Sequence, residues 1–146
     1  MSIFDNKEDI SMASICAQRF VDLLDSKKLN YRTAIDSDGD FVVEFPYSGK
    51  VTKIYFTGNE GSYLSMYLIY ERVPAEKVAD VIFTCNELNS RYKWVTFYVD
   101  KDNDVVLHDD AILSISNAAE EAFELLLRMI KIADDVKPQI MRAIYA

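Results

Sequence analysis

The sequence predicts an α+β fold in which helices cover one face of an antiparallel sheet. Three observations support this prediction. In three separate segments, apolar residues recur at spacings of three and four, which is the period of a helix. In two groups of other segments, apolar and polar residues alternate, which is the period of a strand. The segments follow the order helix, four strands, helix, two strands, helix, whereas a doubly wound parallel sheet needs strands and helices to alternate.

The first half of the chain predicts a helix followed by a four-stranded antiparallel meander. Residues 9–28 form the predicted helix, and its apolar side carries Ile15, Cys16, Phe20, Leu23 and Leu24. From residue 31 the period becomes two, and the expected strands are residues 31–36, 41–45, 51–57 and 62–72. Turns are expected where glycine occurs with small polar residues, at 37–40, 47–49 and 58–61.

The second half predicts a helix, a β-hairpin and a C-terminal helix. The second helix spans residues 73–90, with Val78, Val81, Ile82, Cys85 and Leu88 inward. The hairpin pairs residues 92–100 with 104–110. In the last helix, Asn117 is the expected N-cap with Glu120 three residues on, and the inward residues are Ala119, Ala122, Phe123, Leu126, Leu127, Ile130 and Ala133. Pro138 is expected to end or kink this helix, with a short helix over 138–145 after it.

The composition predicts one domain, residues 1–146, in the cytoplasm. The chain has 16 basic and 24 acidic residues, a net charge of -8, which repels phosphate backbones and argues against a nucleic-acid partner. Its first residues carry acids where a secretory signal is basic, and no apolar run has the length that spans a bilayer. Cys16 and Cys85 are interpreted as reduced core residues, with a disulfide between them as the alternative.

The acidic stretch DKDNDVVLHDD, residues 100–110, is interpreted as a turn and a strand, with no bound metal. A calcium loop of the EF-hand type needs glycine at its sixth position and glutamate at its twelfth, where this chain has Val105 and Ala111. Aspartate and asparagine favour turns because they bond their own backbone. The segment SDGD at 37–40 has its glycine too early for such a loop.

No catalytic residue and no cofactor is expected. His108 with Asp109 or Asp110 could form a base with an orienting carboxylate, but neighbours on a strand point to opposite faces. No nucleophile motif and no phosphate-binding glycine loop occurs, so His108 is interpreted as a surface residue at a strand end. The alternative is a small ligand-binding protein or enzyme that uses the acidic residues around His108.

The sheet face opposite the helices is predicted to bind a protein partner. Alternation assigns a core set to the face under the helices: Phe41, Val43, Phe45, Ile54, Phe56, Leu64, Met66, Leu68, Val95, Phe97 and Val99. The opposite set should be polar, yet it contains Tyr55, Tyr63, Tyr67, Trp94 and Tyr98 together with Ile69. Tyrosine and tryptophan with few charges are typical of protein interfaces. The alternative is that aromatic residues are here only as good strand formers.

The run FTCNELNSRYKWVTFYVDKDNDVVLHDDAIL, residues 83–113, resembles the YbjN family of bacterial sensory transduction regulators. In that family the second helix ends in an asparagine-rich segment, here 86–89, before an aromatic strand and an acidic turn. The resemblance extends over about residues 15–145. It implies a fold similar to type III secretion chaperones, in small acidic proteins that dimerise and bind other proteins. The expected function is therefore a non-enzymatic, chaperone-like protein-binding or regulatory module.

Overall fold

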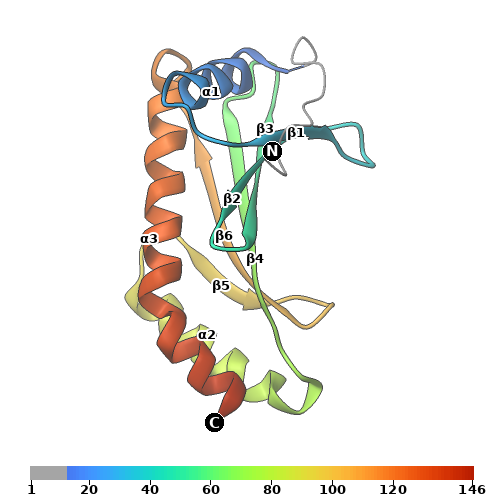
Figure 1. The fold of residues 1–146 in the computed structure, drawn as a ribbon, viewed down its shortest axis with the longest axis vertical. Helices are drawn as coiled ribbons and strands as arrows, with labels where there is room; N and C mark the ends of the chain where they lie inside the picture. The colour runs from blue at the N-terminus through green and yellow to red at the C-terminus, as the bar shows by residue number, and fades with distance from the viewer. Residues whose placement is uncertain (1–12) are drawn as a thin grey trace.

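The computed structural model describes residues 13–146, which form an antiparallel sheet with helices on one face (Figure 1). The helices are α1 (Ile15–Ser26), α2 (Val78–Arg91) and α3 (Ala118–Tyr145), and short 3₁₀ turns over Ala75–Lys77 and Ile115–Asn117 precede α2 and α3. The strands are β1 (Arg32–Ile35), β2 (Phe41–Tyr47), β3 (Lys50–Thr57), β4 (Tyr63–Arg72), β5 (Thr96–Val99) and β6 (Asp104–Ile112). This order confirms the predicted α+β class.

The meander and the hairpin join into one sheet with the strand order β1-β2-β3-β4-β6-β5. The hairpin docks through its second strand, because β6 pairs with β4 over nine residue positions and β5 pairs only with β6. The pairing of β6 with β4 places Tyr67 directly opposite His108. The edge strands of the sheet are β1 and β5.

The helices pack against the inner face of the sheet, which we define as the face that carries Val43, Ile54, Met66 and Leu107. These four residues are fully buried and share one core with the apolar sides of α1, α2 and α3. Figure 1 shows α3 along the length of the sheet, with α1 at one end and α2 at the other. The predicted core set is confirmed, although Val99 is only partly buried.

Three residues that the helical period assigns to the core are exposed instead. Ile15, Ile82 and Leu127 are 42%, 50% and 49% exposed, whereas their chain neighbours Cys16, Val81 and Leu126 are fully buried. Successive residues of a helix are rotated by about 100°, so two adjacent apolar residues cannot both face a narrow contact. The first helix is also shorter than predicted, and residues 9–12 lie outside the described part of the chain.

The last helix begins where predicted, with Asn117 in the N-cap position, but its capping contacts and its C-terminal end differ from the prediction. The Asn117 side chain makes no capping hydrogen bond; instead the carboxylate of Glu121 accepts from the backbone N–H and the hydroxyl of Ser114, at 2.8 and 2.9 Å. Pro138 lies inside α3, which continues to Tyr145, so there is no separate terminal helix. The last turns lean away from the rest of α3 in Figure 1, and buried Ile140 and Ile144 hold them against the core.

None of the helices formed by residues 13–146 combines the length and the apolarity that crossing a lipid bilayer requires.

Candidate functional site: a hollow on the outer sheet face

Four rings lie side by side across the outer face of the sheet, the face that no described helix covers. Tyr55, Tyr67, His108 and Tyr98 come from β3, β4, β6 and β5, in the order of the strands. The Tyr67 and His108 rings are stacked, with centroids 4.4 Å apart and an angle of 5° between the planes. Tyr55 meets Tyr67 edge-on at 6.1 Å, and Tyr98 meets His108 edge-on at 6.4 Å. We call these four residues the aromatic row.

The strand register explains why these rings meet. Tyr67 lies opposite Lys53 on one side and opposite His108 on the other, and His108 also lies opposite Thr96. Tyr55 and Tyr98 are each two positions from those partners, so all four side chains point to the same face. Rings on diagonal positions of neighbouring strands are within reach of one another.

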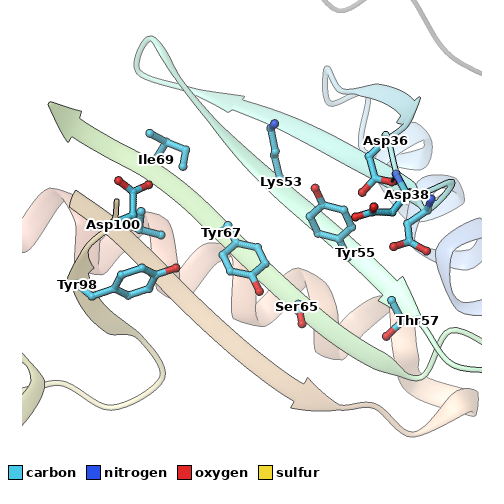
Figure 2. Close-up of a pocket in the computed structure, with 12 residues that line it drawn as sticks. Asp36, Asp38, Lys53, Tyr55, Thr57, Ser65, Tyr67, Ile69, Tyr98 and Asp100 are labelled. Atoms are coloured by element: carbon cyan, nitrogen blue, oxygen red, sulfur yellow. Dashed lines mark hydrogen bonds between the residues drawn. The ribbon is translucent and has the colours of Figure 1, made fainter. Parts of the chain in front are cut away.

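A hollow of about 470 Å³ lies along the aromatic row. Tyr55, Tyr67 and Tyr98 line it, with Ile69 beside them (Figure 2). Val106 also lines the hollow. Val106 is 2% exposed although it points away from the helices, because the neighbouring outer-face side chains cover it. The outer face is therefore a shaped aromatic surface.

Two acidic turns border the hollow, and they have the same structure. Asp36–Asp40 joins β1 to β2, and Asp100–Asp104 joins β5 to β6. In each turn the first aspartate Oδ1 accepts the backbone N–H groups of the third and fifth residues, at 2.9–3.0 Å. The fourth residue has positive φ, 86° at Gly39 and 62° at Asn103. This geometry confirms that residues 100–104 form a turn.

Aspartates from both turns line the hollow. Asp36 and Asp38 lie at the end where Tyr55 is found, and Asp100 lies at the other end near Tyr98 (Figure 2). Asp40, from the same turn as Asp36, also lines the hollow. Figure 2 places Tyr67 between these two ends. Because the turns lie at opposite edges of the sheet, the acidic groups enclose the aromatic row from both sides.

The pKa values of the two tyrosine hydroxyls at the ends of the hollow are affected by this negative charge as well as by burial. Partial burial, and then the carboxylates of Asp36 and Glu44, raise the pKa of Tyr55 above its usual value. Partial burial, and then Tyr67 and the carboxylate of Asp100, raise the pKa of Tyr98. Both groups are therefore neutral at physiological pH and serve as hydrogen-bonding tips of apolar rings.

The predicted geometry at His108 is confirmed in one respect and corrected in another. His108 and Asp109 diverge, since Asp109 lies opposite the buried inner-face residue Met66. His108 is not at a strand end, however, because β6 continues to Ile112. Its Nε2 lies 2.8 Å from Oδ1 of Asp110, which also points to the outer face.

Ser65 completes a contact chain that does not have the order of a catalytic triad. The Ser65 hydroxyl donates to Oδ1 of Asp110 at 2.7 Å, so the carboxylate lies between the serine and His108. In a triad the histidine lies between nucleophile and carboxylate, because it must take the nucleophile's proton. Although partial burial opposes it, hydrogen bonding from Ser65 and His108 lowers the pKa of Asp110, which makes it a weak base.

Asp109 is placed differently from the acids of the outer face. Burial, and then the charge of Asp110, raise the pKa of Asp109 to about 6. Its Oδ2 is buried, and no group within residues 13–146 donates a hydrogen bond to it. Asp109 is therefore a carboxyl group whose ionisation the fold disfavours.

Two predicted partner-binding residues do not join the aromatic row. Tyr63 lies at the start of β4 and is 55% exposed, away from the four rings. Trp94 precedes β5 with a positive φ of 76°, so strand alternation does not set its direction. Its ring lies 4.9 Å from the Arg128 guanidinium of α3. The structure thus groups Tyr55, Tyr67 and Tyr98 and leaves Tyr63 and Trp94 outside.

Sequence reasoning missed His108 as a member of the row, because its ring meets Tyr67 only through the long-range pairing of β6 with β4. It also missed Asn89, whose amide accepts from the N–H of Phe97 at 2.7 Å and donates to its carbonyl oxygen at 2.9 Å. The asparagine-rich segment gave no indication of this partner.

The carboxylates of Asp36, Asp38 and Asp40 are the described group with spacing suited to a metal ion, with ligand oxygens within 4.8 Å of one another. One oxygen of Asp36 is already used by two backbone N–H groups of the turn. The cysteines offer no such site, because both are buried free thiols. Burial raises the pKa of the Cys85 thiol to about 11.

The comparisons with known proteins agree with this fold. The sequence model of the YbjN family, described as "Putative bacterial sensory transduction regulator", matches residues 17–140. No curated protein matches the chain. Among solved structures, the Yersinia pestis type III secretion chaperone SycH in complex with a fragment of YscM2 has a TM-score of 0.53 at 11% identity, covering 84% of this chain and 99% of that one. The ExoU–SpcU complex of the Pseudomonas aeruginosa type III secretion system has a TM-score of 0.53 at 15% identity, covering 84% and 94%.

Proposed function

Since the chain belongs to the YbjN family, we propose that it is a non-enzymatic regulatory module that binds a protein partner on the outer face of its sheet. The observation that carries this proposal is the aromatic row, which lies on a hollowed face that no helix of residues 13–146 covers. Aromatic side chains with polar tips dominate protein interfaces because they bury a large area and still hydrogen-bond.

The structural neighbours support partner binding as the general role. These structures contain SycH with a fragment of YscM2, and ExoU with SpcU in a heterodimer. Since these likenesses establish the fold alone, the choice of the outer face rests on this chain's own residues. The family is described as a regulator of bacterial sensory transduction, and chaperone-like binding of a partner is our proposal for how this chain would serve such a role.

The absence of catalysis is part of the proposal. The contact order Ser65, Asp110, His108 leaves the serine without an adjacent base. The same side chains instead tie β4 to β6 across the outer face. His108 then acts as a ring of the binding surface, stacked on Tyr67.

We propose in addition that the protein works in the cytoplasm as a homodimer. Two buried free thiols suit a reducing compartment. For self-association, α2 presents Ile82 and Phe83, which are 50% and 65% exposed on one helix. This apolar pair lies on a helix and not on the outer sheet face, so a dimer formed there leaves the hollow accessible.

Site-specific photo-cross-linking in the source cell tests the proposed binding face. A benzophenone amino acid at Ile69 would lie at the hollow, whereas the same group at Leu127 would lie on α3 with similar exposure, 43% against 49%. We expect a discrete cross-linked protein from position 69, and its loss when Tyr67→Ser is added. No adduct at 69, or the same adduct at 127, would contradict the proposal.

A further inference from the structure

The hollow combines two chemical features that together select one class of ligand. Its centre presents the faces and edges of tyrosine rings, and its two ends present carboxylates (Figure 2). Aromatic faces carry negative charge density, which attracts cations above the ring. Carboxylates attract the same groups through charge and hydrogen bonds.

The charges that line the hollow do not balance. Among residues 13–146, four aspartates line it, Asp36, Asp38, Asp40 and Asp100, against one cationic residue, Lys53. Lys53 is exposed and lies opposite Glu44 in the register of β2 and β3, so an acidic neighbour is already close to its position. The whole chain adds to this field with a net charge of -8.

We propose that the partner segment held in the hollow carries arginine side chains, which lie against the tyrosines of the aromatic row and pair with the aspartates at its ends. The inference rests on the proposed function and adds the chemistry of the partner. Arginine suits the site better than lysine because its planar guanidinium stacks on rings and bonds carboxylates with two N–H groups. A purely apolar segment would leave the aspartates unpaired beside buried surface.

The raised pKa values of Tyr55 and Tyr98 agree with this assignment. After partial burial, nearby acidic groups contribute to the shift at each end, Asp36 for Tyr55 and Asp100 for Tyr98. A potential that opposes a phenolate favours a cation at the same place. The aspartates and the tyrosine rings therefore both favour a cation in the same hollow.

The experiment uses the full chain and a defined probe. Binding of a fluorescent, N-acetylated hexa-arginine amide is measured by anisotropy at about 0.15 M salt, where charges beyond about 8 Å are screened. The comparison peptide is hexa-citrulline, which has the same shape and no charge. We expect the arginine peptide to bind and the citrulline peptide to bind at least about tenfold more weakly, the change that one lost charge-assisted contact produces.

Two double variants distinguish peptide binding in the hollow from general attraction to the negative charge of the protein. Asp38→Asn with Asp100→Asn removes one charge at each end, and the amide at 100 retains an oxygen for the turn. The control, Asp80→Asn with Glu87→Gln, changes the net charge equally on exposed positions of α2. We expect about three- to tenfold weaker binding for the first pair, about two- to fivefold for Tyr67→Leu, and no change for the control.

Equal weakening by both charge pairs, or no binding of the arginine peptide, would overturn the inference. Binding of spermidine that is as tight, and equally sensitive to Tyr67→Leu, would assign the hollow to a free polyamine and would also overturn it. If position 69 still cross-links a cellular partner in either case, the proposed function stands and only the chemistry of the partner is wrong.

Discussion

The outer sheet face shows how far single residues could be assigned from alternation. Tyr55, Tyr67 and Tyr98 point where the period of two places them, because each lies within a paired strand. Trp94 lies two residues before β5 begins and has a left-handed backbone, so the strand period does not determine the direction of its side chain. A residue pattern predicts direction only where ladder hydrogen bonds fix the backbone.

Asp109 provides a prediction about pH. Its pKa is raised from the usual value near 4 to about 6, so the folded state favours the protonated form. This contribution to stability is present below pH 4 and is lost as the pH rises through 6. The shift corresponds to about 3 kcal/mol, and partial exposure reduces it to about 1–2 kcal/mol.

We therefore expect Asp109→Asn to be more stable than wild type by about 1–2 kcal/mol at pH 7 and nearly equal to it at pH 4. Urea unfolding of both proteins at the two pH values measures this difference, and groups common to both cancel to first order. An advantage of the variant that is the same at pH 4 and pH 7 would show that Asp109 does not titrate between them.

Adjacent leucines of α3 provide a second prediction. Leu126 is fully buried and Leu127 is 49% exposed, although both are apolar and share one helix. Leu126→Ala should lower the free energy of unfolding by about 2–5 kcal/mol because it opens a cavity. Leu127→Ala is the matched control and should change it by less than about 0.5 kcal/mol. Chemical denaturation measures both changes. Similar losses of unfolding free energy in the two variants would mean that the inward face of α3 has been assigned wrongly.

At the scale of elements, the sequence predicted most of the boundaries. It missed the capping contact at the start of α3 and the continuation of α3 through Pro138. The cap comes from Glu121 reaching back to Ser114, where the capping pattern pointed to Asn117 and Glu120. Pro138 was expected to end or kink the helix because it removes a backbone donor, yet the helix continues through it to Tyr145. Buried Val136 and Ile140 on either side of it supply tertiary contacts that local propensity cannot register.

The two acidic turns provide a prediction at this scale. Their first aspartates are occupied by backbone N–H groups of the same turn, which already fix both loops. Millimolar calcium should leave the melting temperature of the protein nearly unchanged, because a ligand stabilises only by binding the folded state selectively. Thermal unfolding with calcium and with a chelator measures this, with magnesium as the control for ionic strength. A rise of many degrees that Asp38→Asn abolishes would establish a metal site at residues 36–40.

At the scale of the molecule, the sequence predicted the order of elements but not that the hairpin joins the meander through the pairing of β6 with β4. Both strands of the hairpin alternate, so either could have paired with β4. The choice of β6 brings His108 beside Tyr67 and creates the aromatic row. The candidate site therefore depends on a long-range pairing that no local pattern encodes, which is why only three of its rings were identified.

Self-association provides a prediction for the whole molecule. Phe83 is 65% exposed beside Ile82 on α2. Packing of a second copy of the chain against this pair would bury both apolar side chains away from water. We expect light scattering to give the mass of a dimer for wild type and of a monomer for Phe83→Ser, with both proteins folded. Tyr98→Ser, on the outer face, is the control and should remain dimeric. A monomeric wild type at high concentration would contradict the proposed dimer.

The contact between Asn89 and Phe97 has a consequence for aggregation. An edge strand offers free N–H and carbonyl groups that can recruit a strand from another molecule. On β5 the edge residue Phe97 already has both groups satisfied by one side-chain amide. A strand from another copy would have to displace this amide to pair at Phe97, so the contact opposes growth of the sheet through β5.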